Sequence, residues 1–338
     1  MARAASAGAP PGVKPRSILR TDQRHWAQIN EASFVGGMRL LFAIYRIGGR
    51  WPFRLVLYPV LAWYLLSKPA ARRASMAYLQ RLCAFNPSVA RLNRIRPDWR
   101  GVYQHFVAFA ENILDKMLLW GGMFKTAEVV SFGREQMQEN MQAQRGGLLI
   151  CAHLGNLELC RVLSRQHRGL RITVLVHTKH AQAFNRLLAK LDPDSQLNLM
   201  QVSEMTPATA MLLAEKVGRG EFVAIAGDRV PVSATPRVAH AAFLGEAAAF
   251  PVGPYVLASL LQCPVYLLFS MTKNGRSECH FELFREAIQL PRKSRDQILH
   301  ELATAYAARL EHFCLKAPLQ WFNFYDFWHL SGYQDASR

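Results

Sequence analysis

The sequence lacks the short motifs that mark several large enzyme classes. It has no G-x-S-x-G turn, which would carry the nucleophile of an α/β-hydrolase, and no G-x-x-x-x-G-K-[ST] phosphate-binding loop. The single G-x-G, at residues 218–220, has no third glycine and so does not form a dinucleotide-binding fingerprint. Serine hydrolases of that fold, P-loop enzymes and Rossmann dehydrogenases are therefore not indicated.

Paired cysteines and clustered metal ligands are also absent. The six cysteines include no C-x-x-C pair and no spacing typical of zinc: Cys83, Cys151, Cys160, Cys263, Cys279 and Cys314. Several lie in apolar runs, which favours reduced core residues in a cytosolic compartment. His177 and His180 have no nearby cysteine or carboxylate to complete a ligand set. We therefore expect no metal site.

No long hydrophobic run reads as a membrane-spanning helix. The longest uncharged run, residues 247–272, contains Pro251, Pro254 and Pro264, and predicts a turn, a short helix and a buried strand. Residues 55–67 give a helix of only about 20 Å, against a hydrocarbon core of about 30 Å. The sequence predicts attachment to one membrane face, and a short N-terminal anchor stays an open alternative.

Acidic residues are scarce at the beginning of the chain. Residues 1–100 hold 17 Lys or Arg but only three acids, Asp22, Glu31 and Asp98, whereas the whole chain has 41 basic and 24 acidic residues. The remaining 238 residues are close to neutral. A basic segment of this kind fits an anionic partner, either a membrane surface or a nucleic acid.

Aromatic and aliphatic residues between the arginines favour the membrane. From residue 34 to residue 63, Arg39, Arg46, Arg50 and Arg54 alternate with Trp, Tyr, Phe and Leu. This pattern is typical of an interfacial amphipathic segment. Two alternatives stay open: core helices of a soluble domain with solvated arginines, and a nucleic-acid-binding surface, although no recognition motif accompanies the charge.

The pattern along the chain predicts three parts. Residues 1–30 form a disordered basic tail without the apolar core of a signal peptide, residues 31–125 a helical membrane-associating region, and residues 126–338 an α/β domain. Helices are expected over residues 70–85 and 99–120. Strands are expected at residues 148–152, 172–177, 197–202, 222–226, 265–269 and 278–284, and helices at residues 157–166, 181–191, 207–217, 254–262 and 294–317. This alternation predicts an α/β fold with a mixed, mainly parallel sheet flanked by helices.

The most informative loop follows the strand expected at residues 148–152. His153 leaves the strand end, Gly155 and Asn156 make a turn, and Glu158 enters the next helix, giving H-x4-E. We expect Glu158 to fix one ring nitrogen of His153 while the other serves as a general base. Backbone N–H groups of residues 154–156 are candidates for holding an oxyanion. A purely structural His–Glu pair is the alternative.

Two further segments are candidates. Asp228 and Arg229 end the strand 222–226, where Arg229 can meet a phosphate or carboxylate and Asp228 can orient it, or the two can form a structural ion pair. The apolar, turn-rich stretch from Phe243 to Pro254 either lines an acyl pocket or forms a core loop.

Taken in order, these blocks resemble the lysophospholipid acyltransferase superfamily and, within it, the bacterial lipid A biosynthesis acyltransferases. Residues 144–158 resemble the glycine-led strand that ends in the H-x4-D/E motif, and Gly227-Asp228-Arg229 falls at the acidic strand-end block. Phe243-Leu244-Gly245 with Pro264-Val265 resembles a later block. Residues 317–321, A-P-L-Q-W, resemble the closing A-P-E-Q-W/Y signature. The similarity runs from about residue 30 to residue 328.

The resemblance implies transfer of a fatty acyl group from acyl carrier protein, or coenzyme A, to a hydroxyl of a membrane glycolipid or lysolipid. His153 would be the base and Glu158 its partner, with Gly155, Asn156, Asp228 and Arg229 at the substrate. It implies no metal, no other cofactor and no covalent acyl-enzyme. It also implies a position on the cytoplasmic face of the bacterial inner membrane.

Two departures favour an acceptor other than the lipid A precursor. The chain has F-N-F-Y-D-F-W at residues 322–328 in place of a basic end, and its Asp228-Arg229 block differs from the usual one. A non-catalytic protein that binds lipid or acyl chains on the same fold is the alternative to an enzyme.

Overall fold

The structure is a computed structural model of the whole chain, and it describes residues 43–120, 122–124, 129–159, 170–176, 197–201, 206–231 and 236–328. The tail expected at residues 1–30 and the first part of the segment 34–63 lie outside the described residues. So do His177 and His180, the helix expected at residues 181–191, and most of the helix expected at residues 157–166.

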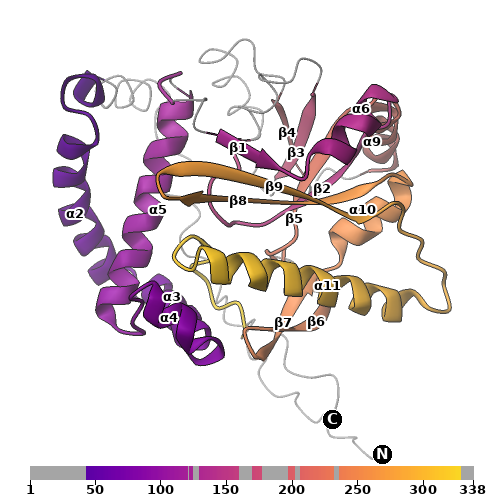
Figure 1. Cartoon of the computed structure of the whole chain (residues 1–338). Helices are drawn as coiled ribbons and strands as arrows, with labels where there is room; N and C mark the ends of the chain where they lie inside the picture. The colour runs from indigo at the N-terminus through magenta and orange to yellow at the C-terminus, as the bar shows by residue number, and fades with distance from the viewer. Residues whose placement is uncertain are drawn as a thin grey trace, which may run out of the picture.

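Four helices form a layer at one end of the molecule, at the left of Figure 1. They are α2 (Arg50–Ser67), α3 (Pro69–Phe85), α4 (Pro87–Leu92) and α5 (Trp99–Trp120). The helices predicted at residues 70–85 and 99–120 are confirmed. Helix α5 begins after Asp98, whose carboxylate accepts the backbone N–H groups of Arg100 and Gly101 and so caps the first turn. No described helix combines the length and hydrophobicity needed to cross a membrane.

A seven-stranded sheet forms the centre of the rest of the chain. Its strand order is β1-β9-β8-β2-β5-β3-β4. The strands are β1 (Val129–Phe132), β2 (Gly147–Cys151), β3 (Ile172–Val176), β4 (Leu197–Gln201), β5 (Phe222–Ala226), β8 (Val265–Lys273) and β9 (Arg276–Arg285). Within this sheet as described, β8 and β9 pair antiparallel and the other neighbours pair parallel. The predicted α/β class with a mixed, mainly parallel sheet is confirmed.

Helices and a small hairpin cover the sheet. Figure 1 shows α11 (Arg295–Lys316) running below the sheet, with the hairpin β6 (Val238–Phe243) and β7 (Glu246–Pro251) beneath it. The other helices are α6 (Glu135–Gln142), α9 (Pro207–Gly218) and α10 (Gly253–Leu261). Two buried clusters lie on opposite faces of the sheet, because Leu148 and Ile150 of β2 belong to one and Leu149 and Cys151 to the other. The larger cluster contains the hairpin, α11 and parts of α3 and α5.

All six predicted strands are present, but the sequence did not predict β1, β6 and β7. The turn and the second strand of this hairpin lie within the stretch 243–254 that we considered as an acyl pocket or a core loop. Phe243 and Phe250 have no exposed surface and pack edge to face, so these two side chains belong to the core, whereas residues 245–247 at the turn are exposed. The division of the chain at residue 125 stays a prediction.

Candidate active site

The topology of the sheet brings His153 and Asp228 together. Strands β2 and β5 are parallel neighbours, with Cys151 paired to Ala226, so the two residues that follow each strand leave the sheet at the same edge. The Gly227 N–H donates to the Cys151 carbonyl over 2.8 Å, which continues this register beyond the strands. Loops at the carboxyl ends of parallel strands are the usual position of active sites in α/β folds.

The Asp228 carboxylate is fully buried and accepts three hydrogen bonds. Its Oδ1 lies 2.7 Å from His153 Nδ1, and its Oδ2 accepts the His153 backbone N–H over 2.7 Å and the Trp321 indole N–H over 2.9 Å. Burial by itself would raise the pKa of Asp228, but His153 and Arg229 outweigh burial and hold this pKa below its ordinary value. Asp228 is therefore ionised at neutral pH.

This carboxylate sets the chemistry of His153. A carboxylate can only accept a hydrogen bond, so the neutral imidazole carries its proton on Nδ1 and leaves the lone pair of Nε2 free to take a proton. The His153 side chain is 28% exposed, whereas Asp228 is completely buried. The geometry is that of a general base held in one tautomer by a buried carboxylate.

The expected pairing of Glu158 with His153 is not what the structure shows at Nδ1. Asp228, which we expected to contact substrate, takes this position. The reason is topological: β5 lies beside β2 in the sheet, whereas Glu158 lies in the turn beyond Asn156, and its backbone N–H donates to the Asn156 side chain over 3.1 Å. Asp228 therefore occupies the position at His153 Nδ1 where we expected Glu158.

Gly155 and Asn156 shape the turn after His153. Gly155 has φ +62°, and a Cβ there would lie 2.2 Å from the Ser270 carbonyl oxygen, so a side chain is excluded. Its N–H donates to the Gln320 carbonyl over 2.8 Å, so of the three backbone N–H groups that we expected to hold an oxyanion, that of Gly155 is already engaged. Asn156 is 4% exposed, and its Nδ2 is a buried donor without a hydrogen-bond partner in the described structure. This donor is a candidate to bind substrate.

Charged side chains lie beside the pair. Arg229 is exposed and donates from one end of its guanidinium to the Phe322 carbonyl over 3.1 Å. Lys116 of α5 interacts electrostatically with Glu158 and Arg229; burial lowers its pKa, the positive Arg229 lowers it further, and the negative Glu158 opposes both. Glu158 therefore has a cationic neighbour, although it is not the partner of His153 Nδ1.

A segment near the C-terminus forms hydrogen bonds with both His153 and Asp228. We call residues 318–325 the C-terminal strap. Leu154 and Trp321 form an antiparallel bridge, and the Phe322 N–H donates to the His153 carbonyl over 2.8 Å. The sequence contained a signal for this segment, the A-P-L-Q-W block, but we assigned no role to Trp321, the second side chain that holds Asp228.

Comparison with protein families gave a match that covers the residues of this site. The family model described as bacterial lipid A biosynthesis acyltransferase matches residues 124–329, which include both strand ends and the C-terminal strap. The comparison with curated proteins found no match.

Proposed function

The chain belongs to the bacterial lipid A biosynthesis acyltransferase family and is an acyltransferase, and on this premise we propose that it moves a fatty acyl group from a thioester donor to a hydroxyl of a membrane glycolipid or lysolipid. The observation that supports this assignment is the hydrogen bond of 2.7 Å between the partly exposed His153 ring and the buried Asp228 carboxylate. Among the described residues, the hydrogen-bond partners of this pair include no serine or cysteine side chain, which fits direct attack by the acceptor hydroxyl on the thioester.

In the first step, His153 Nε2 takes the proton of the acceptor hydroxyl as the oxygen attacks the thioester carbonyl carbon. A C–O bond forms and the carbonyl π electrons move to the oxygen, giving a tetrahedral oxyanion. Asp228 stabilises the imidazolium that results. The buried Asn156 amide is our candidate donor to the oxyanion, since it has no other partner in the described structure.

In the second step, the oxyanion re-forms the carbonyl and the C–S bond breaks. The departing thiolate takes the proton from His153 Nε2, so the products are an ester and a free thiol, and the histidine returns to its neutral form. No covalent acyl-enzyme is formed on this route.

The experiment is a transfer assay with the full chain. Dodecanoyl-acyl carrier protein and dodecanoyl-coenzyme A serve as donors and a lipid extract of bacterial inner membranes as acceptor, with acylated lipids detected by mass spectrometry. We expect His153→Ala to lower the rate about 100- to 10,000-fold, the usual contribution of a general base. His300→Ala, at an exposed histidine of α11, is the matched control and should leave the rate unchanged.

A folded His153→Ala protein with the wild-type rate would end this proposal. If the wild-type protein binds acyl chains but turns over neither donor, even by slow hydrolysis, the protein is a non-catalytic acyl-chain binding protein on the same fold.

We propose acyl carrier protein as the donor, because it is an acidic protein and the N-terminal third of this chain is basic. Arg72 and Arg73 are exposed on α3. Replacing both with Glu should raise KM for dodecanoyl-acyl carrier protein more than tenfold, since charge complementarity acts mainly on association. KM for dodecanoyl-coenzyme A is the internal control. An equal change for both donors, or none for either, would contradict docking of the carrier protein at α3.

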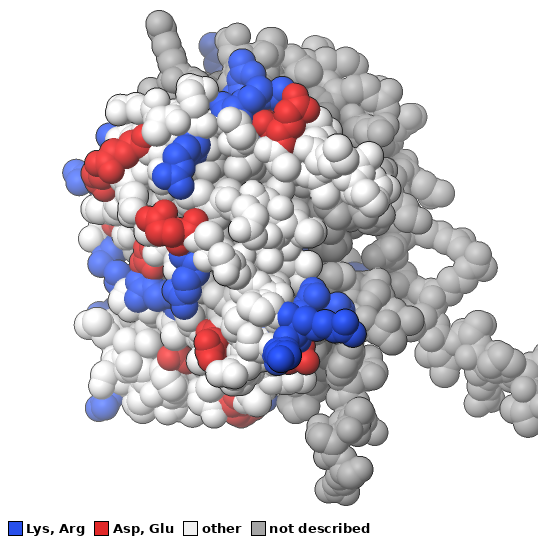
Figure 2. Space-filling model, turned by 90° about the vertical axis from the view of Figure 1, so that its right-hand side faces the viewer, with Lys and Arg blue, Asp and Glu red and all other residues white. Residues whose placement is uncertain are grey.

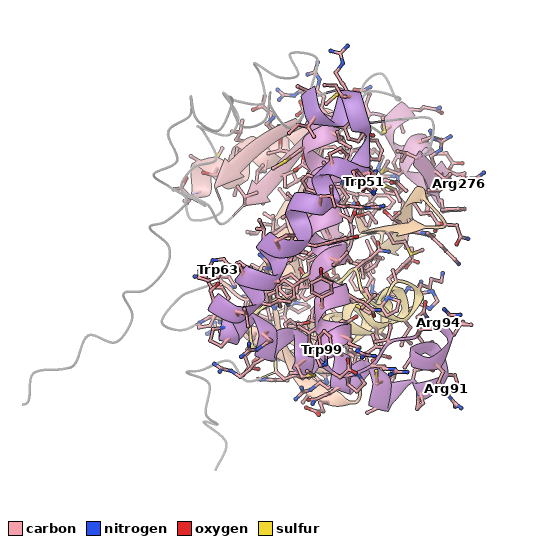
Figure 3. The ribbon with its side chains drawn as sticks, turned by 90° about the vertical axis from the view of Figure 1, so that its left-hand side faces the viewer. Trp51, Trp63, Arg91, Arg94, Trp99 and Arg276 are labelled. Atoms are coloured by element: carbon pink, nitrogen blue, oxygen red, sulfur yellow. The ribbon has the colours of Figure 1, made fainter. Side chains whose placement is uncertain are left out.

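We also propose that the α2–α5 layer is the part of the molecule that contacts the membrane. Trp51 and Trp63 of α2 and Trp99 of α5 are 67%, 72% and 69% exposed, and Figure 3 shows all three on one side of the molecule. Exposed Arg91 and Arg94 lie on the same side (Figure 3). Tryptophan at the headgroup level with arginine nearby is typical of proteins bound to one face of an anionic bilayer. The cytoplasmic face of the bacterial inner membrane fits this surface.

A further inference from the structure

Two helices of the N-terminal layer hold the C-terminal strap by its carbonyl groups. The Tyr78 hydroxyl of α3 donates to the Pro318 carbonyl over 2.9 Å. His105 Nε2 of α5 lies 3.0 Å from the Trp321 carbonyl oxygen. Both side chains are completely buried. The helical layer therefore contacts the C-terminal strap, which also binds His153 and Asp228.

The environment of His105 fixes which nitrogen carries its proton. Burial lowers the pKa of His105 to about 4, so at neutral pH the ring is neutral and has one N–H. The Trp321 carbonyl can only accept, and therefore this N–H is on Nε2. His105 Nδ1 then accepts a hydrogen bond from the Ser75 hydroxyl, which lies 2.9 Å away. Ser75 thus satisfies Nδ1 of the tautomer that binds the strap.

The hydrogen bonds continue from Trp321 to the reacting group. The Trp321 indole N–H is bonded to Asp228, and the Phe322 N–H that follows is bonded to the His153 carbonyl. Asp228 in turn binds the His153 ring. A connected series of hydrogen bonds therefore runs from α3 through α5 and the strap to the general base.

We propose that His105 is a positioning residue for acyl transfer, because it holds the Trp321 backbone where the indole N–H reaches Asp228 and the strap fixes His153. The proposal rests on the proposed function of His153. A displacement of about 1 Å at a reacting group can cost about 100-fold in rate, so the loss of one buried hydrogen bond outside the site can matter.

A core role is the competing explanation, because aromatic rings surround His105. Its ring centroid lies 4.9 Å from that of Phe324 and 5.5 Å from that of Tyr78. His105→Phe keeps an aromatic ring and removes both hydrogen bonds. His105→Gln places an amide N–H near the position of Nε2 and restores the bond to the Trp321 carbonyl. Comparing the two separates positioning from packing.

The test measures kcat, KM and the pH dependence of the rate with dodecanoyl-acyl carrier protein. We expect His105→Phe to lower kcat about 10- to 100-fold with KM unchanged, and His105→Gln to recover most of the loss. When the indole N–H leaves Asp228, more negative charge faces His153 and favours its protonated form. The rate of His105→Phe should therefore reach half its maximum at a higher pH than that of the wild type.

Two additional variants complete the design. Ser75→Ala should give a smaller loss with the same direction of pH shift, and it remains informative if His105→Phe does not fold. Tyr266→Phe removes a partly buried hydrogen bond from Asn140 on the other face of the sheet and should change neither kcat nor the pH profile.

The proposal is overturned if the folded His105 and Ser75 variants keep the wild-type kcat and pH profile. It is also overturned if His105→Gln loses as much activity as His105→Phe with no pH shift in either, since that result indicates packing alone. His153→Ala separates this failure from failure of the proposed function: an inactive His153→Ala with unaffected His105 variants refutes only the positioning role.

Discussion

At the scale of single residues, Asp228 and Glu158 have different roles. The buried Asp228 carboxylate accepts a hydrogen bond from His153 Nδ1, whereas Glu158 interacts electrostatically with Lys116. We expect Asp228→Asn to lower kcat about 1,000- to 10,000-fold, because an amide can also stabilise the wrong imidazole tautomer. Glu158→Gln should lower kcat less than about tenfold, because Glu158 does not hold the tautomer of His153. Initial rates of acyl transfer at saturating donor measure both, and a larger loss for Glu158→Gln than for Asp228→Asn would return the partner role to Glu158.

The sequence was sufficient to single out His153 and Asp228 but not to pair them. Each follows an apolar strand, and polar residues at strand ends are a local signal. Which strand ends meet depends on strand order, and β2 lies beside β5 although β3 and β4 come between them in the chain. Nearness in sequence therefore favoured Glu158. His105 gave no signal, because its partners Ser75 and Trp321 are 30 and 216 positions away.

Asn156 provides a second test at this scale. Its Oδ1 accepts the Glu158 N–H, while its buried Nδ2 has no partner within the described residues. Asn156→Asp keeps the acceptor and removes the donor. We expect kcat to fall at least about 100-fold with KM little changed, which is the effect of losing one oxyanion donor. A thermal melt like that of the wild type confirms folding, and a kcat within about twofold of the wild type would exclude Asn156 from the oxyanion site.

At the scale of helices and strands, long periodic patterns were predictable and short alanine-rich strands were not. Helix α5 has Val102, Phe106 and Ile113 at helical spacing, and it was found at its predicted bounds. Strands β6 and β7 contain V-A-H-A-A-F and E-A-A-A-F-P, and alanine is uncommon in strands. Their pairing depends on the left-handed turn at Leu244 and Gly245 and on packing against α11. Such tertiary contacts are not visible in a local pattern.

The connection between α5 and the C-terminal strap predicts a pH-dependent stability. His105 has an ordinary pKa of 6.5 when exposed and about 4 when buried, so below pH 6.5 the unfolded chain binds a proton that the folded chain does not. The folded state therefore loses stability as the pH falls, by about 2 kcal/mol between pH 8 and pH 5 from this residue.

Urea unfolding of the wild type and His105→Gln at these two pH values measures this effect. From pH 8 to pH 5, the free energy of unfolding of the wild type should fall by about 2 kcal/mol more than that of His105→Gln, because glutamine does not titrate. Other histidines contribute equally to both proteins and cancel. A difference that does not change with pH would mean that His105 is protonated in the folded protein.

At the scale of the whole molecule, two opposite sides differ in their charged and exposed aromatic residues. The side with α2 presents three exposed tryptophans in Figure 3. On the opposite side, Figure 2 shows acidic and basic side chains interspersed. The sequence of this layer agrees, since residues 50–120 hold 11 basic and three acidic residues. The α2–α5 layer therefore combines the features of a membrane-facing surface with direct contacts to the strap.

Vesicle binding tests this division. Replacing Trp51, Trp63 and Trp99 together with Ser should weaken binding to vesicles of phosphatidylglycerol and phosphatidylethanolamine at least tenfold, because each large side chain moved from water into an apolar environment contributes about 1.5–3 kcal/mol. Met211→Ser is the matched control, since Met211 is 74% exposed on α9, away from this layer. Binding by the wild type should fall with added salt and on pure phosphatidylcholine. Equal vesicle binding by the triple variant and the wild type would show that the tryptophans do not contact the bilayer. Salt-sensitive binding to duplex DNA, without vesicle binding, would identify nucleic acid as the partner of the basic region.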